Sequence, residues 1–258
     1  NIAGHDGGGV YNVLGSMEIT STQIFKNTAS LDGGGVQNGI YGIMEISNSL
    51  ITDNEASNDG GGILNEGDSL SIVNTVIDSN NVIGGYGGGL YNEEQAVTIS
   101  NDSSISYNSS ERSGGGIHNE EGTIEIDAVE IIENESRKEG GGGIYNTNDG
   151  YIFLLNSILS GNLARENGGG IENYGGGIVI DNSMIAGNES GNDGGGIRNL
   201  YGGGVEITDS TLTKNIAIDD GGAFHNDDDT SSITIDNSNV TYNHAEQNGG
   251  GGYNGFHA

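Results

Sequence analysis

The densest group of carboxylates in the chain lies on both sides of a glycine turn near the C-terminal end. Asp219 and Asp220 precede this turn, and Asp227, Asp228 and Asp229 follow it. Hard oxygen ligands of this kind suit Ca²⁺ or Mg²⁺. The repeated calcium-binding nonapeptide GGxGxDxUx is missing, and the same residues are also typical of a solvated acidic turn. The sequence therefore offers weak Ca²⁺ binding at these aspartates as its only candidate cofactor site.

A second group of residues combines charges of both signs. Arg198, in the segment "GGGIRN", is the basic residue that the pattern places on a strand with its side chain outward. The same position in the neighbouring repeats holds Glu172 and His225. An acid beside a base is what proton transfer requires. Because three residues are a thin basis for a catalytic site, we assign no catalytic residue and expect no enzymatic activity.

Histidines are a further source of possible chemistry, and the chain has five of them: His5, His118, His225, His244 and His257. His118 and His225 occupy the same position in repeats that lie four units apart. At a strand spacing of about 4.8 Å, this separation is roughly 19 Å. The two rings therefore cannot act on one substrate atom. We expect both to be exposed to solvent.

An internal repeat sets the elements that must position these residues. A glycine-rich triplet starts at ten places that are 26 to 28 residues apart, namely Gly7, Gly33, Gly60, Gly87, Gly114, Gly141, Gly168, Gly194, Gly221 and Gly249. Five residues after each start there is an asparagine: Asn12, Asn38, Asn65, Asn92, Asn119, Asn146, Asn173, Asn199, Asn226 and Asn254. A match in every copy defines a true repeat, and a period of 20 to 50 residues is typical of solenoids.

The pattern within each repeat is that of β-strands. Apolar and polar residues alternate over short runs, as in Met44-Glu45-Ile46, and Gly, Asn, Asp and Ser separate the runs. Each repeat has a further asparagine, the last one in the consensus IxIxNSxIxxNxA, which we call the second asparagine: Asn27, Asn54, Asn80, Asn108, Asn134, Asn162, Asn188, Asn215 and Asn243. No run has the length or period of a helix. Three short strands are therefore expected in each repeat.

These features predict an all-β fold, a right-handed parallel β-helix of about ten coils of about 27 residues with three short strands in each coil. Residues 1–258 would form a single domain, because one coil cannot bury its own apolar face and must stack on its neighbours. We expect the asparagines to point inward and to form hydrogen-bonded ladders along the stack. The glycine triplets would allow sharp turns and close approach of backbone to backbone.

Composition narrows the classes of partner. The 258 residues include 50 glycines but no proline, cysteine or tryptophan, and 37 acidic residues outweigh 7 Lys and Arg to give a net charge of −30. Nucleic acid is an unfavourable partner, because neutralising phosphates requires clustered Lys and Arg. No stretch approaches the roughly 18 apolar residues of a membrane span. The sequence thus predicts an acidic repeat protein that binds neither nucleic acid nor the membrane interior.

The motifs also resemble those of a known family. The paired "GGGI" and "IxxN" segments are similar to the GGA[ILV] and FxxN repeats of polymorphic outer-membrane proteins and, more broadly, to the pectin-lyase-like superfamily of right-handed β-helices. The resemblance covers essentially the whole chain. Ile or Leu replaces Phe in nearly every "IxxN", and Gly-Gly-Ala is found only at residues 221–223.

This resemblance implies an extracellular or cell-surface protein that acts as a structural or adhesive stalk. It also implies an alternative, a carbohydrate-active β-helix with lyase or hydrolase activity or a carbohydrate-binding module, for which surface glycans would be the partners. A lyase of this type would need a calcium-binding acidic cluster beside an Arg or Lys base on one strand face. Only Arg198 with its two neighbours comes near that requirement.

Two surfaces are candidates for self-association. One is a set of outward-facing apolar side chains on the third strand of the repeat, which would form an exposed stripe unless turns cover it: Phe25, Leu50, Val76, Ile132, Ile158 and Met184. The other consists of the chain ends, where no polar cap is visible. Uncapped coils expose strand edges. The chain is therefore expected to be a segment of a longer array or a subunit that stacks into a filament.

Overall fold

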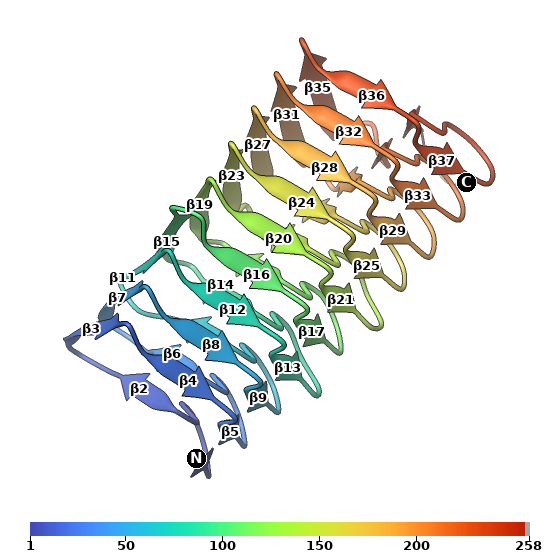
Figure 1. Cartoon of the computed structure of the whole chain (residues 1–258). Helices are drawn as coiled ribbons and strands as arrows, with labels where there is room; N and C mark the ends of the chain where they lie inside the picture. Colours follow the sequence, from blue (N-terminus) through green and yellow to red (C-terminus); the bar gives the residue numbers. More distant parts are fainter. Residues whose placement is uncertain (256–258) are drawn as a thin grey trace.

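The chain folds into a β-solenoid of parallel stacked coils, as predicted (Figure 1). The structure is a computed structural model that describes residues 1–255, so His257 lies outside the described residues. Each coil contributes one strand to each of four sheets, and every strand pairs in parallel with its equivalents in the next coils. The coils are about 27 residues long, as the spacing of the triplets requires. Within residues 1–255 there is no helix.

We number the sheets in the order in which a coil passes through them after its glycine triplet. Sheet 1 contains β2 (Val10–Asn12), β6 (Val36–Asn38), β10 (Ile63–Asn65), β14 (Leu90–Glu93), β18 (Ile117–Glu120), β22 (Ile144–Thr147), β26 (Ile171–Tyr174), β30 (Ile197–Leu200), β34 (Phe224–Asn226) and β38 (Gly252–Asn254). Sheet 2 contains β3 (Ser16–Thr20), β7 (Ile43–Ser47), β11 (Ser69–Val73), β15 (Ala96–Ser100), β19 (Thr123–Asp127), β23 (Tyr151–Leu155), β27 (Gly177–Asp181), β31 (Gly204–Thr208) and β35 (Ser232–Asp236).

The strands of the other two sheets have three and two residues, respectively. Sheet 3 contains β4 (Gln23–Phe25), β8 (Leu50–Thr52), β12 (Val76–Asp78), β16 (Ser104–Ser106), β20 (Glu130–Ile132), β24 (Ile158–Ser160), β28 (Met184–Ala186), β32 (Thr211–Thr213) and β36 (Asn239–Thr241). Sheet 4 contains β1 (Ile2–Ala3), β5 (Thr28–Ala29), β9 (Glu55–Ala56), β13 (Asn81–Val82), β17 (Ser109–Ser110), β21 (Glu135–Ser136), β25 (Leu163–Ala164), β29 (Glu189–Ser190), β33 (Ile216–Ala217) and β37 (His244–Ala245).

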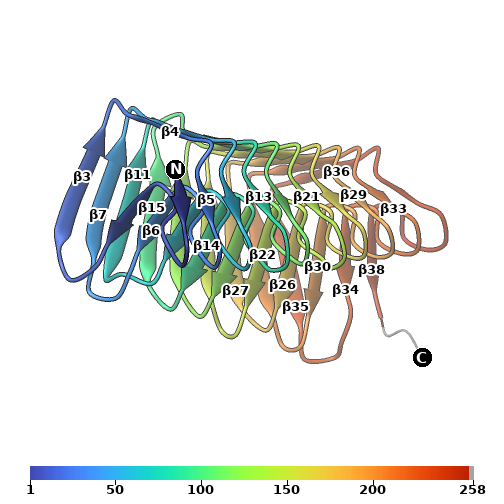
Figure 2. The same ribbon diagram turned by 90° about the horizontal axis from the view of Figure 1, so that it is seen from below.

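Sheet 4 corrects the expectation of three strands in each coil. Its strands are only two residues long, too short for an alternating pattern to reveal them in the sequence. A sharp corner separates them from sheet 3, because the residue before the second asparagine has a left-handed backbone, as at Asp53 with φ of 54°. In Figure 2 the four sheets run side by side along the solenoid.

Aliphatic side chains fill the interior of the coils. The inward residues of sheets 1, 2 and 3 form continuous columns, as in the coil that contains Ile117, Ile126 and Ile131, all of which are 0% exposed. Burying such a side chain contributes about 1.5–3 kcal/mol relative to leaving it in water. No single coil could achieve this burial alone, so the stack folds as one solenoid.

Both asparagine ladders form as predicted. In the first ladder, from Asn12 to Asn254, each Nδ2 donates to the Oδ1 of the asparagine in the next coil at 2.8–2.9 Å. In the second, from Asn1 to Asn243, the same bonds measure 2.7–3.0 Å. These amides also bind backbone carbonyls that the corners leave unpaired, for example Asn119 to Gly122 at 2.7 Å.

The glycine triplets allow the backbone of one coil to approach the next. Gly114, first in its triplet, has φ of +66°, a region that favours glycine. A Cβ atom on Gly115 would lie 2.5 Å from the carbonyl oxygen of Gly142 in the following coil. The repeated triplet is therefore explained by turn geometry and close packing.

A third ladder, of hydroxyl groups, was not predicted. It lies at the corner between sheets 2 and 3, where the backbone N–H of one residue donates to the hydroxyl of its equivalent in the next coil. Ser157 donates to Ser183, and Ser183 to Ser210, each at 3.0 Å. The "NS" of the consensus is the signal that marks these positions. Val129 replaces the hydroxyl in one coil and interrupts the ladder there.

Candidate functional site

One column of outward-facing side chains is mostly covered, although its first member, Tyr11, is 47% exposed. It consists of the residue before the ladder asparagine in each strand of sheet 1, and we call it the outer track. Its members are, in order, Tyr11, Gln37, Leu64, Tyr91, His118, Tyr145, Glu172, Arg198, His225 and Tyr253. The loop leading into each triplet and the turn after each ladder asparagine flank it, so that Tyr91, His118, Glu172 and His225 are at most 7% exposed.

The middle of the outer track begins with an aromatic run, formed by Tyr91, His118 and Tyr145 together with Tyr86 from the loop before a triplet. The rings of Tyr91 and Tyr145 stack on the two sides of His118, with centroids 5.1 and 5.0 Å away. Tyr86 approaches the same ring from the covering loop at 4.8 Å. Offset stacking of this kind adds about 0.5–1.5 kcal/mol per pair beyond area burial.

Polar atoms of the aromatic run find partners in the flanking segments. The Tyr91 hydroxyl donates to Glu120 Oε2 at 2.5 Å, and Ser113 Oγ lies 3.1 Å from His118 Nδ1. Burial, together with the bond to Glu120, raises the pKa of Tyr91 far above its ordinary value. Burial lowers the pKa of His118 to about 3, so this ring is neutral at physiological pH. The aromatic run is therefore an uncharged stack.

The next part of the outer track is an ionic run. Arg198 Nη1 donates to Glu172 Oε1 at 3.0 Å, and Nη2 contacts Asp227 Oδ2. Beyond them, His225 Nδ1 lies 3.4 Å from Asp193 Oδ2. The side chains of Arg198 and Glu172 are only 15% and 7% exposed. Burial raises the pKa of Glu172 to about 7, although the charge of Arg198 acts in the opposite direction.

A glycine outside the regular triplet creates the space for Glu172. Gly140 comes directly before a triplet, in the segment "EGGGGIYN". A Cβ atom on Gly140 would overlap Glu172 Oε2 at 1.3 Å. The equivalent position carries a side chain in the other coils, for example Asp193 and Asp220. The fourth glycine in this run is thus the sequence signal for a buried carboxylate in the next coil.

The structure corrects the expectation for the two histidines of the outer track. His118 and His225 are 3% and 0% exposed, because the loop before the triplet lies across each ring. They are four strands apart in sheet 1, as predicted, and belong to different runs. Arg198, Glu172 and His225 are strand neighbours, as the repeat implied.

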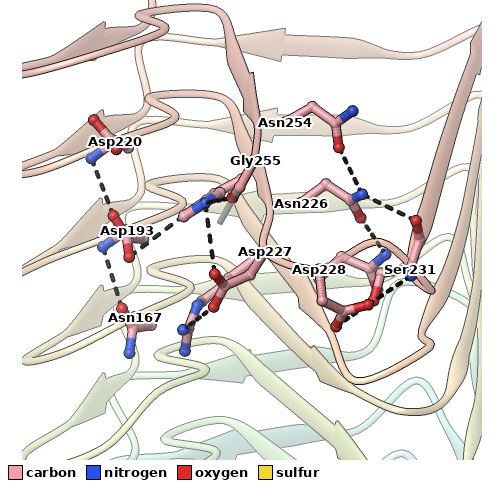
Figure 3. Close-up of polar contacts among 12 residues, drawn as sticks. Asn167, Asp193, Asp220, Asn226, Asp227, Asp228, Ser231, Asn254 and Gly255 are labelled. Atoms are coloured by element: carbon pink, nitrogen blue, oxygen red, sulfur yellow. Dashed lines mark hydrogen bonds and ion pairs between the residues drawn. The ribbon is translucent and has the colours of Figure 1, made fainter. Parts of the chain in front are cut away.

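The five aspartates near the C-terminal end do not converge. Asp227 pairs with Arg198. Asp228 folds back on its own turn, where its Oδ1 accepts the backbone N–H groups of Thr230 and Ser231, each at 2.8 Å (Figure 3). Burial alone would raise the pKa of Asp228, but the hydrogen bonds from Thr230 and Ser231 lower it well below its ordinary range. These carboxylates therefore already have partners within the protein.

The remaining candidates lie elsewhere in the same coil. Asp219 accepts a bond from Gln247 at 2.5 Å, and Asp229 is exposed. Asp220 is 1% exposed and accepts both the backbone N–H and the side-chain amide of Asn248 at 2.8 Å. Within residues 1–255, no group of three or more His, Cys, Asp or Glu side chains is placed to hold a metal ion. Calcium binding at the exposed carboxylates remains a prediction.

Asp220 belongs to a polar column that the sequence did not reveal. Asn167, Asp193, Asp220 and Asn248 each precede a triplet. Asn167 and Asp193 accept the backbone N–H of the next member of the column through Oδ1 (Figure 3), and Asp220 accepts that of Asn248, where the column ends. Asp32 and Asp59 do the same near the N-terminal end, at 3.0 and 2.8 Å. The signal is the Asp or Asn directly before the glycines.

The expected apolar stripe is interrupted in the structure. Its first column runs through Gln23, Leu50, Val76, Ser104, Glu130, Ile158, Met184, Thr211 and Asn239. The second runs through Phe25, Thr52, Asp78, Ser106, Ile132, Ser160, Ala186, Thr213 and Thr241. Ser104 and Glu130 separate the Leu50–Val76 pair from the Ile158–Met184 pair. Sheet 3 therefore presents two short apolar patches in place of one stripe.

Comparison of the chain with protein-family models, curated proteins and solved structures finds no match. Within the described residues, no helix is long and apolar enough to cross a membrane. The role of the outer track and the ladders is therefore inferred from their geometry alone. Its charged and polar groups mainly bind one another from coil to coil.

Proposed function

We propose that the chain is a rigid, acidic, non-catalytic solenoid that serves as a structural or adhesive module outside the cell or at its surface. The observation that carries this proposal is the pair of unbroken asparagine ladders that link every coil from Asn1 and Asn12 to Asn243 and Asn254. A stack held by these ladders and by aliphatic columns is suited to holding a surface in place. The resemblance to the repeats of polymorphic outer-membrane proteins supports the location.

The covered outer track supports a non-catalytic role. Its carboxyl group with a raised pKa, Glu172, is buried, and Arg198 donates to one of its oxygens. A substrate would have to displace the covering loops to reach it. Self-association is part of the proposal, with the apolar patches Leu50–Val76 and Ile158–Met184 on sheet 3 as the contact surfaces. The net charge of −30 keeps such rods soluble and attracts divalent cations.

One specific observation favours a carbohydrate-active alternative. Glu172 is a carboxyl group with a pKa of about 7 beside an arginine, a pairing that can perform acid–base catalysis. The test is incubation of the purified chain with neutral and acidic polysaccharides, followed by assay of reducing ends and unsaturated products. We expect neither product. Release that rises with protein concentration and disappears in Glu172→Gln would overturn the non-catalytic proposal.

Electron microscopy of the same protein, with Ca²⁺ and with chelator, tests the structural role. We expect short rods of roughly 45 Å, which is about nine turns at the ordinary strand spacing, or side-by-side and end-to-end assemblies of such rods. Assemblies that need Ca²⁺ would support cation binding at the exposed carboxylates. Compact or irregular particles under both conditions would contradict a rod-like module.

A further inference from the structure

A groove of about 420 Å³ crosses the outer face of sheet 2, away from the outer track. It spans four successive strands, β23, β27, β31 and β35. Glycines of β27, β31 and the turns before them make up much of its lining, with Tyr151 at one side and Ser232 at the other. Ile178 and Val205 point into the core, at 2% and 1% exposure, so they line the groove with backbone atoms.

Two glycines form the floor of the groove. The first residues of the four strands pair in the order Tyr151, Gly177, Gly204 and Ser232. In the earlier coils this column carries side chains, from Ser16 to Thr123. The two missing side chains open a gap between Tyr151 and Ser232, which lie about 14 Å apart over three strand spacings.

The space above the second glycine is open. A Cβ atom on Gly204 would approach only the hydroxyl of Ser232, at 3.9 Å. At Gly177 the situation differs, because a Cβ atom there would lie 2.4 Å from the ring of Tyr151. The ring therefore leans over Gly177 and forms one wall, while the position above Gly204 is free for a ligand.

Exposed tyrosines adjoin this gap. Tyr151 is 52% exposed. Tyr174 and Tyr201 directly precede the lining residues Gly175 and Gly202, and their ring centroids lie 4.4 Å apart. The face of an aromatic ring carries partial negative charge. The weakly positive C–H groups on the apolar face of a pyranose ring complement such a surface.

The polar groups of the groove disfavour an anionic ligand and suit one with many hydroxyls. Asp149 and Glu206 supply carboxylates, which only accept hydrogen bonds, and Ser232 and Thr234 supply hydroxyls. The lining contains no Lys, Arg or His. A polyanionic chain would meet repulsion from the two carboxylates and from the net charge of −30.

We propose that this glycine-floored groove binds a neutral hexopyranose oligosaccharide, stacked on Tyr151 and hydrogen-bonded to Asp149 and Glu206. The site would give the adhesive role its ligand class, and in that respect it rests on the proposed function. It does not depend on the ionic run of the outer track. A few convergent polar groups beside an aromatic wall are the usual composition of a small-molecule site.

The test is a titration of the whole chain with cellotriose, mannotriose and maltotriose, with trigalacturonate and chitosan trimer as charged comparisons, followed by ligand-observed NMR and calorimetry. We expect at least one neutral trisaccharide to bind, and Gly204→Leu to weaken that binding at least tenfold by filling the gap. The matched control is Ala96→Leu, an exposed position in the same column of β15, which should leave binding unchanged. Tyr151→Ala should also weaken it about tenfold.

Thermal unfolding of each variant separates loss of binding from loss of fold. Gly204→Leu should unfold at the same temperature as the parent or higher, because glycine weakens a strand. If Gly204→Leu binds every neutral sugar as tightly as the parent protein does, the site is overturned. Tighter binding of trigalacturonate or of the chitosan trimer than of the neutral trisaccharides would also overturn it. Intact rods that bind none of the five probes would also reject the groove, while leaving the rod-like role standing.

Discussion

The two runs of the outer track share one backbone position but differ in chemistry. In the aromatic run, His118 lies between two tyrosine rings and is neutral. In the ionic run, Arg198 lies between Glu172 and Asp227. Beneath these two central residues the inward side chains are the same, an isoleucine and a ladder asparagine at 0% exposure: Ile117 and Asn119 in one strand, Ile197 and Asn199 in the other. The inner residues thus carry the fold, and the outer position is free to vary from coil to coil.

The largest difference between the runs should follow removal of the central charge. Arg198→Met leaves two covered carboxylates without their partner and should lower the free energy of unfolding by about 3–5 kcal/mol at pH 8. The loss should shrink at pH 5, where Glu172 is protonated. Denaturant titration measures both values. The control is Arg165→Met, whose side chain is 66% exposed and 3.8 Å from Glu135, with an expected loss of about 0–1 kcal/mol. Equal losses would contradict the distinction.

Substitutions in the ladder should affect the two runs alike. Asn119 lies under the aromatic run and Asn199 under the ionic run, and each donates to the next asparagine and to a backbone carbonyl. Each also accepts a bond from the preceding ladder asparagine. Asn119→Leu and Asn199→Leu should each cost about 2–4 kcal/mol, since at least three buried hydrogen bonds of about 1 kcal/mol each are lost. The same denaturant titration measures both losses. If the two losses in unfolding free energy differ by more than a factor of two, the residues of the outer track influence the stability of the ladder beneath them.

The pH dependence of stability should have opposite signs in the two runs. Because the folded pKa of Glu172 is raised from 4.5 to about 7, its contribution is full below pH 4.5 and is lost as the pH rises through 7. Glu172→Gln should remove that decline, which amounts to about 3 kcal/mol. The lowered pKa of His118 gives a contribution that is full above pH 6.5 and is lost as the pH falls toward 3. His118→Gln should therefore flatten the acid side alone, in unfolding curves recorded from pH 3 to 8.

The smallest effect should come from one hydroxyl group in the aromatic run. Tyr91→Phe removes the hydrogen bond to Glu120 but keeps the ring stack, so about 1–2 kcal/mol of stability should be lost. The ring contacts with His118 should persist in the near-ultraviolet circular dichroism spectrum. A loss as large as that of Arg198→Met would mean that Glu120 is held in place by this one bond.

The sequence predicts the interior of the solenoid well. Isoleucines such as Ile126 and asparagines such as Asn119 recur at fixed spacing because every coil must meet the same neighbours above and below. The two-residue strands such as Thr28–Ala29 escape prediction, since no alternation can be seen over two residues. The serine at the position of Ser183 recurs in the consensus, but its hydrogen bonds link successive coils, so the sequence alone did not reveal the ladder.

The candidate site was predicted in composition but not in burial. The repeat placed Glu172, Arg198 and His225 side by side, and the structure confirms this adjacency. Their cover comes from loops whose path the strand pattern does not define. Glu172 occupies the space that a Cβ atom would fill on Gly140, a residue 32 positions earlier in the chain (172 − 140). The groove depends likewise on missing side chains, which a search for reactive residues passes over.

The equivalence of ladder positions has a consequence for inheritance. An unequal exchange between two copies of the repeat in the gene would insert or delete a whole coil and restore every inward contact. The segments Tyr174–Gly177 and Tyr201–Gly204 read "YGGG" at a separation of 27 residues (201 − 174), one repeat length. A single duplication that copied one such coil would have doubled the floor of the groove. In this architecture, recombination can change the width of a surface site without a new fold being required.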